Sequence, residues 1–260
     1  MESKVTKYSA AAVVALAMAM VLSNPFGTSG NGNVALADVQ EKVKQIDTMI
    51  LRGQQIYTLA AAPNISFEFD VDMYLSKQLG YTEKGYLNKT LVYQITLNRP
   101  QNQTLIVLPI WKKCLMFPST DEQIKIMEML TPHGLVDFFQ QTDYENTGRS
   151  RIDGVEVDCF EVNDVKSFEN FLPKFLFDIQ KGSFKVWVSV KKLLPIRMEG
   201  DIFLGESLGT VFTEGILHEV CAMEAYDVEL DKSLFDCSMP DGYSELTLSD
   251  ILNFIPMKPK

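Results

Sequence analysis

Residues 183–226 read SFKVWVSVKKLLPIRMEGDIFLGESLGTVFTEGILHEVCAMEAY, and this stretch decides the fold. Every second residue is apolar over 184–190 and again over 196–204, with a turn at 192–195 between the two runs. A third extended run covers 210–226. Alternation of this length is typical of strands in a sheet with one apolar face and one largely wet face. The stretch therefore predicts three consecutive long strands whose apolar face needs a cover.

The N-terminal half predicts a series of hairpins. Its best strand is 65–75, in which Ile65, Phe67, Phe69, Val71, Met73 and Leu75 alternate with polar residues and Tyr74. Shorter strands are predicted at 81–87, 90–98, 104–109, 112–117, 145–152 and 155–162. Asp153-Gly154 between the last two is a strong hairpin signal. The total is about 11 strands.

Four segments have helical spacing instead. Asp38 with Glu41 forms a capping box, and an apolar stripe then runs to Gly53, which predicts an amphipathic helix of about four turns packed on the sheet. Further helical segments are predicted at 122–130, 132–139 and 167–179, the last unusually rich in Phe. Strand runs and helices of this kind predict an α+β protein, with an antiparallel sheet and helices covering it.

The N-terminus predicts an export signal in residues 1–25. Lys4 and Lys7 precede an uncharged apolar run, Tyr8–Leu22, whose length fits either an uncleaved membrane anchor or a cleaved signal peptide. A small-x-small cleavage sequence stands at 35–37. Residues 26–37 are expected to be a flexible linker, and 38–260 one folded domain. The membrane is thus an expected partner through Tyr8–Leu22.

Composition excludes several classes of function. The 260 residues carry a formal net charge of −10, which argues against nucleic-acid binding because that needs clustered Lys and Arg. The two histidines, His133 and His218, have no second histidine near them, so no metal site is expected. No phosphate-binding loop or catalytic motif occurs. Neither a cofactor nor an enzymatic activity is therefore predicted.

Two carboxylate pairs and four cysteines need an interpretation. Asp70 with Asp72, and Glu156 with Asp158, share strand faces, and the favoured interpretation of both pairs is the solvated side of a sheet. The cysteines are Cys114, Cys159, Cys221 and Cys237. Export would permit disulfides, with Cys221–Cys237 the least demanding in loop length, but buried free thiols are an equal alternative.

Short motifs along the chain form a recognisable order. They are Val34-Ala35-Leu36-Ala37-Asp38-Val39, Gly148-Arg149, Ile152-Asp153-Gly154-Val155, Val186-Trp187-Val188, Leu194-Pro195-Ile196-Arg197, Leu230-Asp231, Leu234-Phe235 and Pro240-Asp241-Gly242-Tyr243. The order resembles bacterial envelope proteins of the LolA/LolB-like class over residues 38–245. The resemblance implies an incomplete antiparallel β-barrel of about 11 strands around a hydrophobic cavity, with helices as a lid.

The resemblance also implies a function. Family members carry lipoprotein acyl chains through the periplasm, and relatives of the RseB type sense envelope stress and bind a protein partner. We therefore expect a non-enzymatic binder of lipid or lipoprotein acyl chains in the bacterial envelope. The protein is expected to be anchored in the inner membrane with its domain in the periplasm. Alternatively, the N-terminal segment is cleaved and the protein is periplasmic or secreted. The alternative is a sensor module with a protein partner. The expected cavity wall is Phe67, Phe69, Met73, Val186, Val188, Met198 and Ile202, and the expected lid residues are Phe171, Phe175 and Leu176.

Overall fold

A computed structural model describes residues 34–60, 62–121, 124, 128, 131–163, 179–204 and 215–247. The N-terminal strands are β1 (Thr48–Leu59), β2 (Ser66–Ser76), β3 (Gly80–Leu87), β4 (Thr90–Asn98), β5 (Gln103–Leu108) and β6 (Lys113–Pro118). The later strands are β7 (Glu145–Ile152), β8 (Val155–Val162), β9 (Ile179–Ser189), β10 (Pro195–Leu204), β11 (Gly215–Tyr226) and β12 (Ser244–Glu245). The helices are α2 (Leu36–Val43) and α4 (Pro132–Gln140), with 3-10 turns η1 (Pro109–Trp111) and η2 (Lys232–Phe235).

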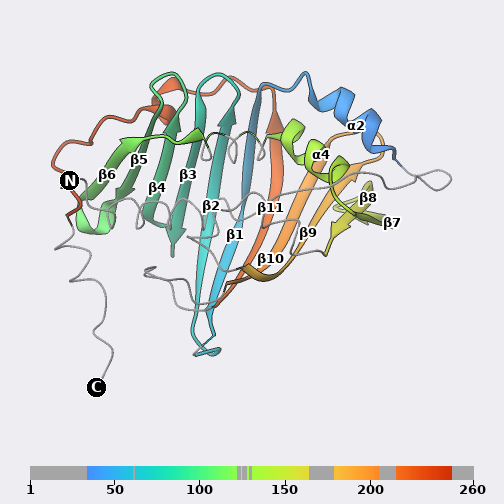
Figure 1. Cartoon of the computed structure of the whole chain (residues 1–260), viewed down its shortest axis with the longest axis horizontal. Coiled ribbons are helices and arrows are strands. Elements are labelled where there is room, and N and C mark those ends of the chain that lie inside the picture. Colours follow the sequence, from blue (N-terminus) through green and yellow to red (C-terminus); the bar gives the residue numbers. More distant parts are fainter. Residues whose placement is uncertain are drawn as a thin grey trace.

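All twelve strands belong to one open sheet, in the order β12-β6-β5-β4-β3-β2-β1-β11-β10-β9-β8-β7 (Figure 1). Every neighbouring pair is antiparallel except β12 with β6. The predicted antiparallel sheet is thus confirmed, with one strand more than the eleven expected. The long strand β1 lies in the middle and joins the N-terminal strands to the C-terminal ones.

The helix predicted from Asp38 to Gly53 is wrong over most of its length. Helix α2 begins at Leu36, ends at Val43, and has Ala35 rather than Asp38 at its N-cap, with no side-chain hydrogen bond there. From Thr48 onward the predicted helix is instead β1, because the buried apolar residues of this segment follow period 2 and the strand gains hydrogen-bonded neighbours on both sides. Gly53 permits close strand packing: a Cβ there would lie 2.0 Å from the carbonyl oxygen of Val220.

Two local predictions are confirmed. Asp153 and Gly154 have φ values of 49° and 81°, the left-handed pair that a tight two-residue hairpin needs between β7 and β8. Helix α4 begins at Pro132, and the hydroxyl of Thr131 caps it by accepting a hydrogen bond from the Gly134 N–H at 3.1 Å.

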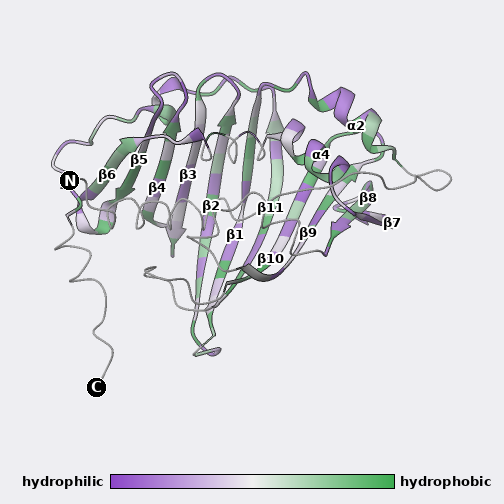
Figure 2. Cartoon of the chain, in the orientation of Figure 1, coloured by the Kyte–Doolittle hydropathy of each residue, from purple (hydrophilic) through white to green (hydrophobic). Residues whose placement is uncertain are grey.

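One face of the sheet carries the main core, and we call it the inner face. It includes the buried side chains of Phe184, Val186 and Val188 in β9, which alternate with polar or half-buried residues. Figure 2 shows hydrophobic and hydrophilic bands alternating along the long strands of the sheet. The buried Phe138 of α4 packs edge-on against Phe184, with ring centroids 5.8 Å apart. Helices α2 and α4 also contact each other, so they close one end of the inner face (Figure 1).

Asp158 corrects the solvated interpretation of the Glu156 and Asp158 pair. Its side chain is fully buried and accepts hydrogen bonds from the Val34 N–H at 2.6 Å and from Arg149 Nε at 3.0 Å. Burial alone raises the pKa of the carboxyl, but the hydrogen bonds from Arg149 and Val34 outweigh it and lower the pKa overall. The carboxylate therefore fixes residue 34, which the sequence assigned to the linker, to the sheet.

The outer face of β3 to β6 is covered by the segment after β11. The Thr82 hydroxyl donates to the carbonyl of Leu234 at 2.6 Å, and the Asn98 amide donates to that of Phe235 at 2.7 Å. Cys237 packs in a small outer-face cluster with Leu105, Val107 and Cys114. This half of the sheet is therefore buried on both faces, which the sequence did not predict.

Several sequence predictions fall on residues outside the described part. These are the export segment Tyr8–Leu22, the helix at 167–179 up to residue 178, most of the helix at 122–130, and residues 210–214. Within the part of the chain that is described, no helix has the length and hydropathy of a membrane span.

Candidate functional site

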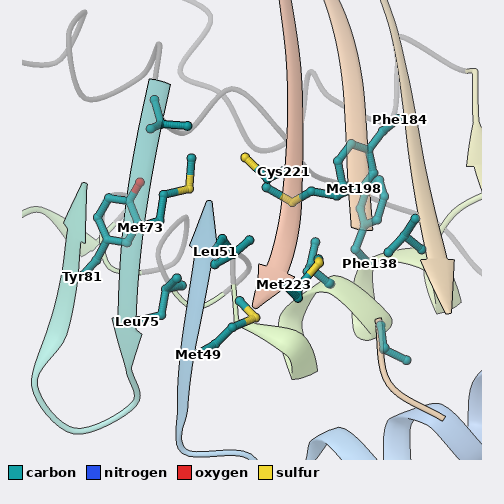
Figure 3. Close-up of a cluster of buried hydrophobic side chains, with 14 of the residues drawn as sticks. Met49, Leu51, Met73, Leu75, Tyr81, Phe138, Phe184, Met198, Cys221 and Met223 are labelled. Atoms are coloured by element: carbon teal, nitrogen blue, oxygen red, sulfur yellow. The ribbon is translucent and has the colours of Figure 1, made fainter. Parts of the chain in front are cut away.

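The candidate site is the inner face between β3 and β9. Five of the seven expected wall residues are buried there in one core cluster: Met73, Val186, Val188, Met198 and Ile202. Figure 3 shows how side chains from β1, β2, β3, β9, β10, β11 and α4 converge above the sheet, among them Met49, Met73, Met198 and Met223. Unbranched Met side chains adapt to irregular neighbours, so this surface is both apolar and deformable.

Phe67 and Phe69 lie at the opposite end of the wall from α2 and α4. The strand register puts Phe67 beside Tyr57 and Phe69 beside Gln55, on the inner face. Phe69 is half-buried and packs edge-on against Tyr93, whereas Phe67 is 42% exposed. The expected lid residues Phe171, Phe175 and Leu176 lie outside the described residues.

A shallow groove begins at Phe67. It has a volume of about 480 Å³ and is lined by Ser66, Phe67, Glu68, Asp70, Leu87, Asn88 and Lys89. Strand β2 pairs with β3 only from Asp70 onward, while its pairing with β1 starts at Ser66. Ser66 to Phe69 therefore present a strand edge beside the groove.

The inner face also holds a buried polar cluster that the sequence interpretation missed. We use "polar cluster" for Gln55, Tyr81, Glu83, Tyr93, Glu219 and Cys221. The hydroxyls of Tyr81 and Tyr93 hydrogen-bond to Glu83, the latter at 2.6 Å, and Gln55 Nε2 lies 3.5 Å from Glu83 Oε1. The Cys221 thiol lies 3.2 Å from Glu219 Oε1.

Glycine makes room for this cluster. The ring of Tyr93 lies over Gly85, where an added Cβ would be 2.0 Å from the ring carbon Cε1. The ring can then reach across β3 toward Gln55, whose Oε1 lies 3.1 Å from the Tyr93 hydroxyl. Without a side chain at position 85, aromatic and carboxyl groups fit in one layer of the core.

Burial governs the charge of the two glutamates. Burial raises the pKa of Glu219 to about 8, with the Glu83 carboxylate adding to the shift. Burial also raises the pKa of Glu83, although hydrogen bonds from Tyr81, Tyr93 and Gln55 oppose this shift. Among the described residues no Lys or Arg pairs with either carboxyl. At neutral pH Glu219 is therefore mostly a neutral acid, which both donates and accepts hydrogen bonds in an apolar surround.

A signal for Glu219 existed in the sequence. Glu219 lies on the inner face of β11 between Leu217 and Cys221, and the neighbouring residues on this face of the strand are apolar and buried. An acid at such a position is a buried polar group, and a buried polar group in a core needs an explanation. Glu83 gives less signal, because the segment around it does not alternate clearly.

The other expected candidates lie elsewhere. His218 faces outward and its Nδ1 lies 2.8 Å from Asp201, while His133 lies 3.2 Å from Asp137 on α4. Asp70 is exposed and Asp72 pairs with Arg52 at 3.1 Å, as expected for a solvated side. In the described ranges no group of three or more His, Cys, Asp or Glu side chains is placed to hold a metal ion.

Comparisons with known proteins concern the fold. No protein-family model and no curated protein sequence matches the chain. Among solved structures, LprF from Mycobacterium bovis is similar at 11% identity and a TM-score of 0.41, over 80% of this chain and 95% of that chain. The lipoprotein LppX from Mycobacterium tuberculosis is similar at 14% identity and a TM-score of 0.43, over 75% and 96% of the two chains.

A LolA superfamily protein from Nitrosomonas europaea is also similar, at 11% identity and a TM-score of 0.31, over 78% of this chain and 98% of that chain. The class that the sequence motifs resemble is thus found again among structures similar to this chain. At these identities and TM-scores the likeness concerns the fold alone, and no activity is argued from it.

Proposed function

We propose that the chain is a non-enzymatic binding protein of the bacterial envelope, which takes lipid or lipoprotein acyl chains on the inner face of its sheet. The observation that carries this proposal is the Met-rich apolar inner face, which runs from the buried core to the half-exposed aromatic residues Phe69 and Phe67. An alkyl chain gains about 0.8 kcal/mol for each CH₂ that it buries against such a surface.

In this proposal the wall consists of Phe67, Phe69, Met73, Val186, Val188, Met198 and Ile202, and the lid residues are Phe171, Phe175 and Leu176. The raised pKa of Glu219, about 8, supports the arrangement. A neutral carboxyl can lie beside an alkyl chain at a much lower desolvation cost than a carboxylate, and it can donate a hydrogen bond to an ester or amide carbonyl.

Residues 1–25 are proposed to hold the domain at the membrane or to direct its export. The tether between anchor and domain then ends near residue 33, because Val34 and Leu36 are buried in the fold. A shortened protein for binding experiments should accordingly start no later than Gly30.

A protein-binding role is the second candidate, and one observation favours it. Ser66 to Phe69 form an exposed strand edge beside the groove at Phe67. Edges of this kind accept an extended peptide as an additional strand. A sensor module would use this edge for a partner in the envelope.

The test is native mass spectrometry of residues 30–260, purified without detergent after export. We expect an added mass of lipid size that is lost on denaturation. Phe67→Ser should lower the bound fraction, whereas Ile216→Ser, a comparably exposed residue on the outer face, should not. The acyl-chain proposal fails if neither the parent protein nor Ile216→Ser carries an added mass. If a photo-crosslinker at residue 67 then captures an envelope protein, the sensor role is favoured.

A further inference from the structure

Strand β2 runs past the end of its neighbour β3, which leaves part of the β2 edge open. The turn Asn88-Lys89, with φ values of 50° and 64°, ends β3 at Leu87 and returns the chain into β4. Strands β1 and β2 continue beyond this point (Figure 1). Within the described part of the chain, residues 66–69 pair with β1 and with no other strand.

Two residues of this edge have backbone groups that point to the open side. The Leu59 N–H donates to the Ile65 carbonyl at 3.3 Å, so the odd-numbered residues at this end of β2 bond to β1. Hydrogen-bonded pairs alternate in an antiparallel ladder. Phe67 therefore bonds to β1, while the N–H and C=O groups of Ser66 and Glu68 point away from it. These groups are placed to pair with a short added strand.

The outer side of the edge is acidic. Glu68 and Asp70 are exposed and line the groove together with Lys89. Asp70 accepts a hydrogen bond from the Gln54 amide at 3.4 Å, and among the described residues none of the three charged side chains forms an ion pair. Two carboxylates and one ammonium leave the groove with a net negative charge. An added strand therefore gains from basic side chains on its outer side.

The inner side of the same edge is apolar. Phe67 is 42% exposed there, and strand alternation puts Leu87, which is 36% exposed, on the same side. Both side chains line the groove. Successive residues of a strand point to opposite faces, so an added strand meets carboxylates with every second residue and apolar side chains with the residues between. The edge thus selects an extended peptide in which basic and apolar residues alternate.

We propose that residues 66–68 bind an extended peptide of alternating basic and apolar residues as an additional strand. The inference rests on the second candidate function above, to which it adds the chemistry of the partner, and it does not depend on acyl-chain binding at the inner face. A second copy of the chain is a poorer occupant. Two such edges paired antiparallel would place Glu68 and Asp70 of both copies on one face, where the carboxylates repel each other.

The test is a fluorescence-anisotropy titration of the full chain in phosphatidylcholine nanodiscs with a labelled peptide of sequence Lys-Val-Lys-Val-Lys-Val, the Lys-Val peptide. This lipid has no net charge that would attract the peptide, and empty nanodiscs are the blank. We expect saturable binding. A peptide of sequence Glu-Val-Glu-Val-Glu-Val, the Glu-Val peptide, should not bind, and replacing the valines of the Lys-Val peptide by serine should weaken binding.

Charge reversal on the edge is the second arm of the test. Glu68→Lys with Asp70→Lys should weaken binding of the Lys-Val peptide about tenfold and create binding of the Glu-Val peptide. The matched control is Asp143→Lys with Glu145→Lys, an exposed acidic pair of the same spacing at the start of β7, the last strand of the sheet. The control variant should bind both peptides as the parent protein does.

Backbone methylation tests the strand pairing itself. Two further peptides carry N-methyl groups either on the three lysines or on the three valines of the Lys-Val peptide, which removes alternate sets of N–H donors. Only one of these sets faces β2 in a paired strand. One methylated peptide should therefore lose binding, and the other should keep it.

Several results would overturn the proposal. If the Lys-Val peptide does not bind, or binds equally well after the charge reversal at Glu68 and Asp70, the edge does not take it. Equal affinities of the two methylated peptides would show that no strand is added. Dimerisation of the parent protein that competes with the peptide would show that a second copy takes the edge. None of these results depends on whether lipid is found on the inner face, so the two proposals fail separately.

Discussion

The two halves of the sheet differ in how many of their faces are buried. Over residues 182–188 of β9, 198–203 of β10 and 215–224 of β11, buried residues alternate with at least partly exposed ones, so one face packs and the other meets water. In β5 the consecutive residues Thr104, Leu105, Ile106 and Val107 are all buried, because the segment after β11 covers the outer face. Alternation of apolar and polar residues therefore predicts a strand only where one face of the sheet is covered and the other meets water.

The largest expected effect comes from removing the outer cover at Phe235, which is 1% exposed in η2. Phe235→Ala should lower the free energy of unfolding by about 3–5 kcal/mol, because a large buried ring leaves a cavity. Phe203→Ala, on the outer face of the singly covered half, should cost about 1 kcal/mol. Urea unfolding of both variants measures the difference, and equal losses would mean that the outer cover adds nothing.

The stability of the protein should depend on pH through Glu219, which lies in β11 at the boundary between the two halves. Its pKa is about 8 in the fold and 4.5 when unperturbed, so the folded protein holds the proton more tightly. The associated stability is fully present below pH 4.5 and is lost as the pH rises toward 8, at up to about 1.4 kcal/mol per pH unit. Urea unfolding between pH 5 and 9 should show this slope.

Glu219→Gln should flatten that slope. The control is Glu224→Gln on the same strand, since Glu224 is exposed and pairs with Arg52 at 2.9 Å. The Glu224→Gln variant should keep the same dependence of stability on pH as the parent protein. A parent protein whose stability is constant from pH 5 to pH 8 would contradict the buried neutral acid.

A smaller effect should follow from cutting one hydrogen bond of the outer cover. Thr82→Val leaves the Leu234 carbonyl without the hydroxyl that now donates to it at 2.6 Å, which should cost about 1–3 kcal/mol. Thr90→Val at an exposed position of β4 should change the stability by no more than about 0.5 kcal/mol. Amide exchange of residues 232–235 should accelerate in Thr82→Val only; unchanged exchange would mean that this bond does not hold the segment.

The smallest effect concerns the thiols. Cys221 lies on the inner face and Cys237 on the outer face, so the sheet separates the two cysteines whose loop length seemed most favourable. All four cysteines are buried and free in the fold. A reductant should therefore not shift the urea midpoint, and thiol titration in denaturant should find all four groups. A smaller number would reveal a disulfide and contradict the four free thiols.

The sequence predicted the strands best where local signals agreed. The hairpin at Asp153-Gly154, the helix that begins at Pro132 and the alternating strands β2 and β9 to β11 all follow from turn chemistry and periodicity. The same approach failed for β1, because a capping box and an apolar stripe are local features. The pairing of β1 with two distant strands is a tertiary effect that outweighs them.

The burial of Met73, Val186, Val188, Met198 and Ile202 on one face could also be predicted, since these residues are in register within their own strands. The polar cluster could not, because its members come from β1, β3, β4 and β11 and meet only after the strand order is known. The cover over β5 was missed for a similar reason. Residues 230–246 have little periodicity, and their place depends on a sheet built by other segments.

The central position of β1 has a consequence for how the protein is made. Met49 pairs with Tyr226, so the strand that leaves the ribosome first must wait for the last long strand before both of its edges are hydrogen-bonded. Pairings this distant in the chain form slowly, and an open edge can pair with other chains in the meantime. The newly synthesised protein is therefore most prone to aggregation in the interval between completing β6 and completing β11.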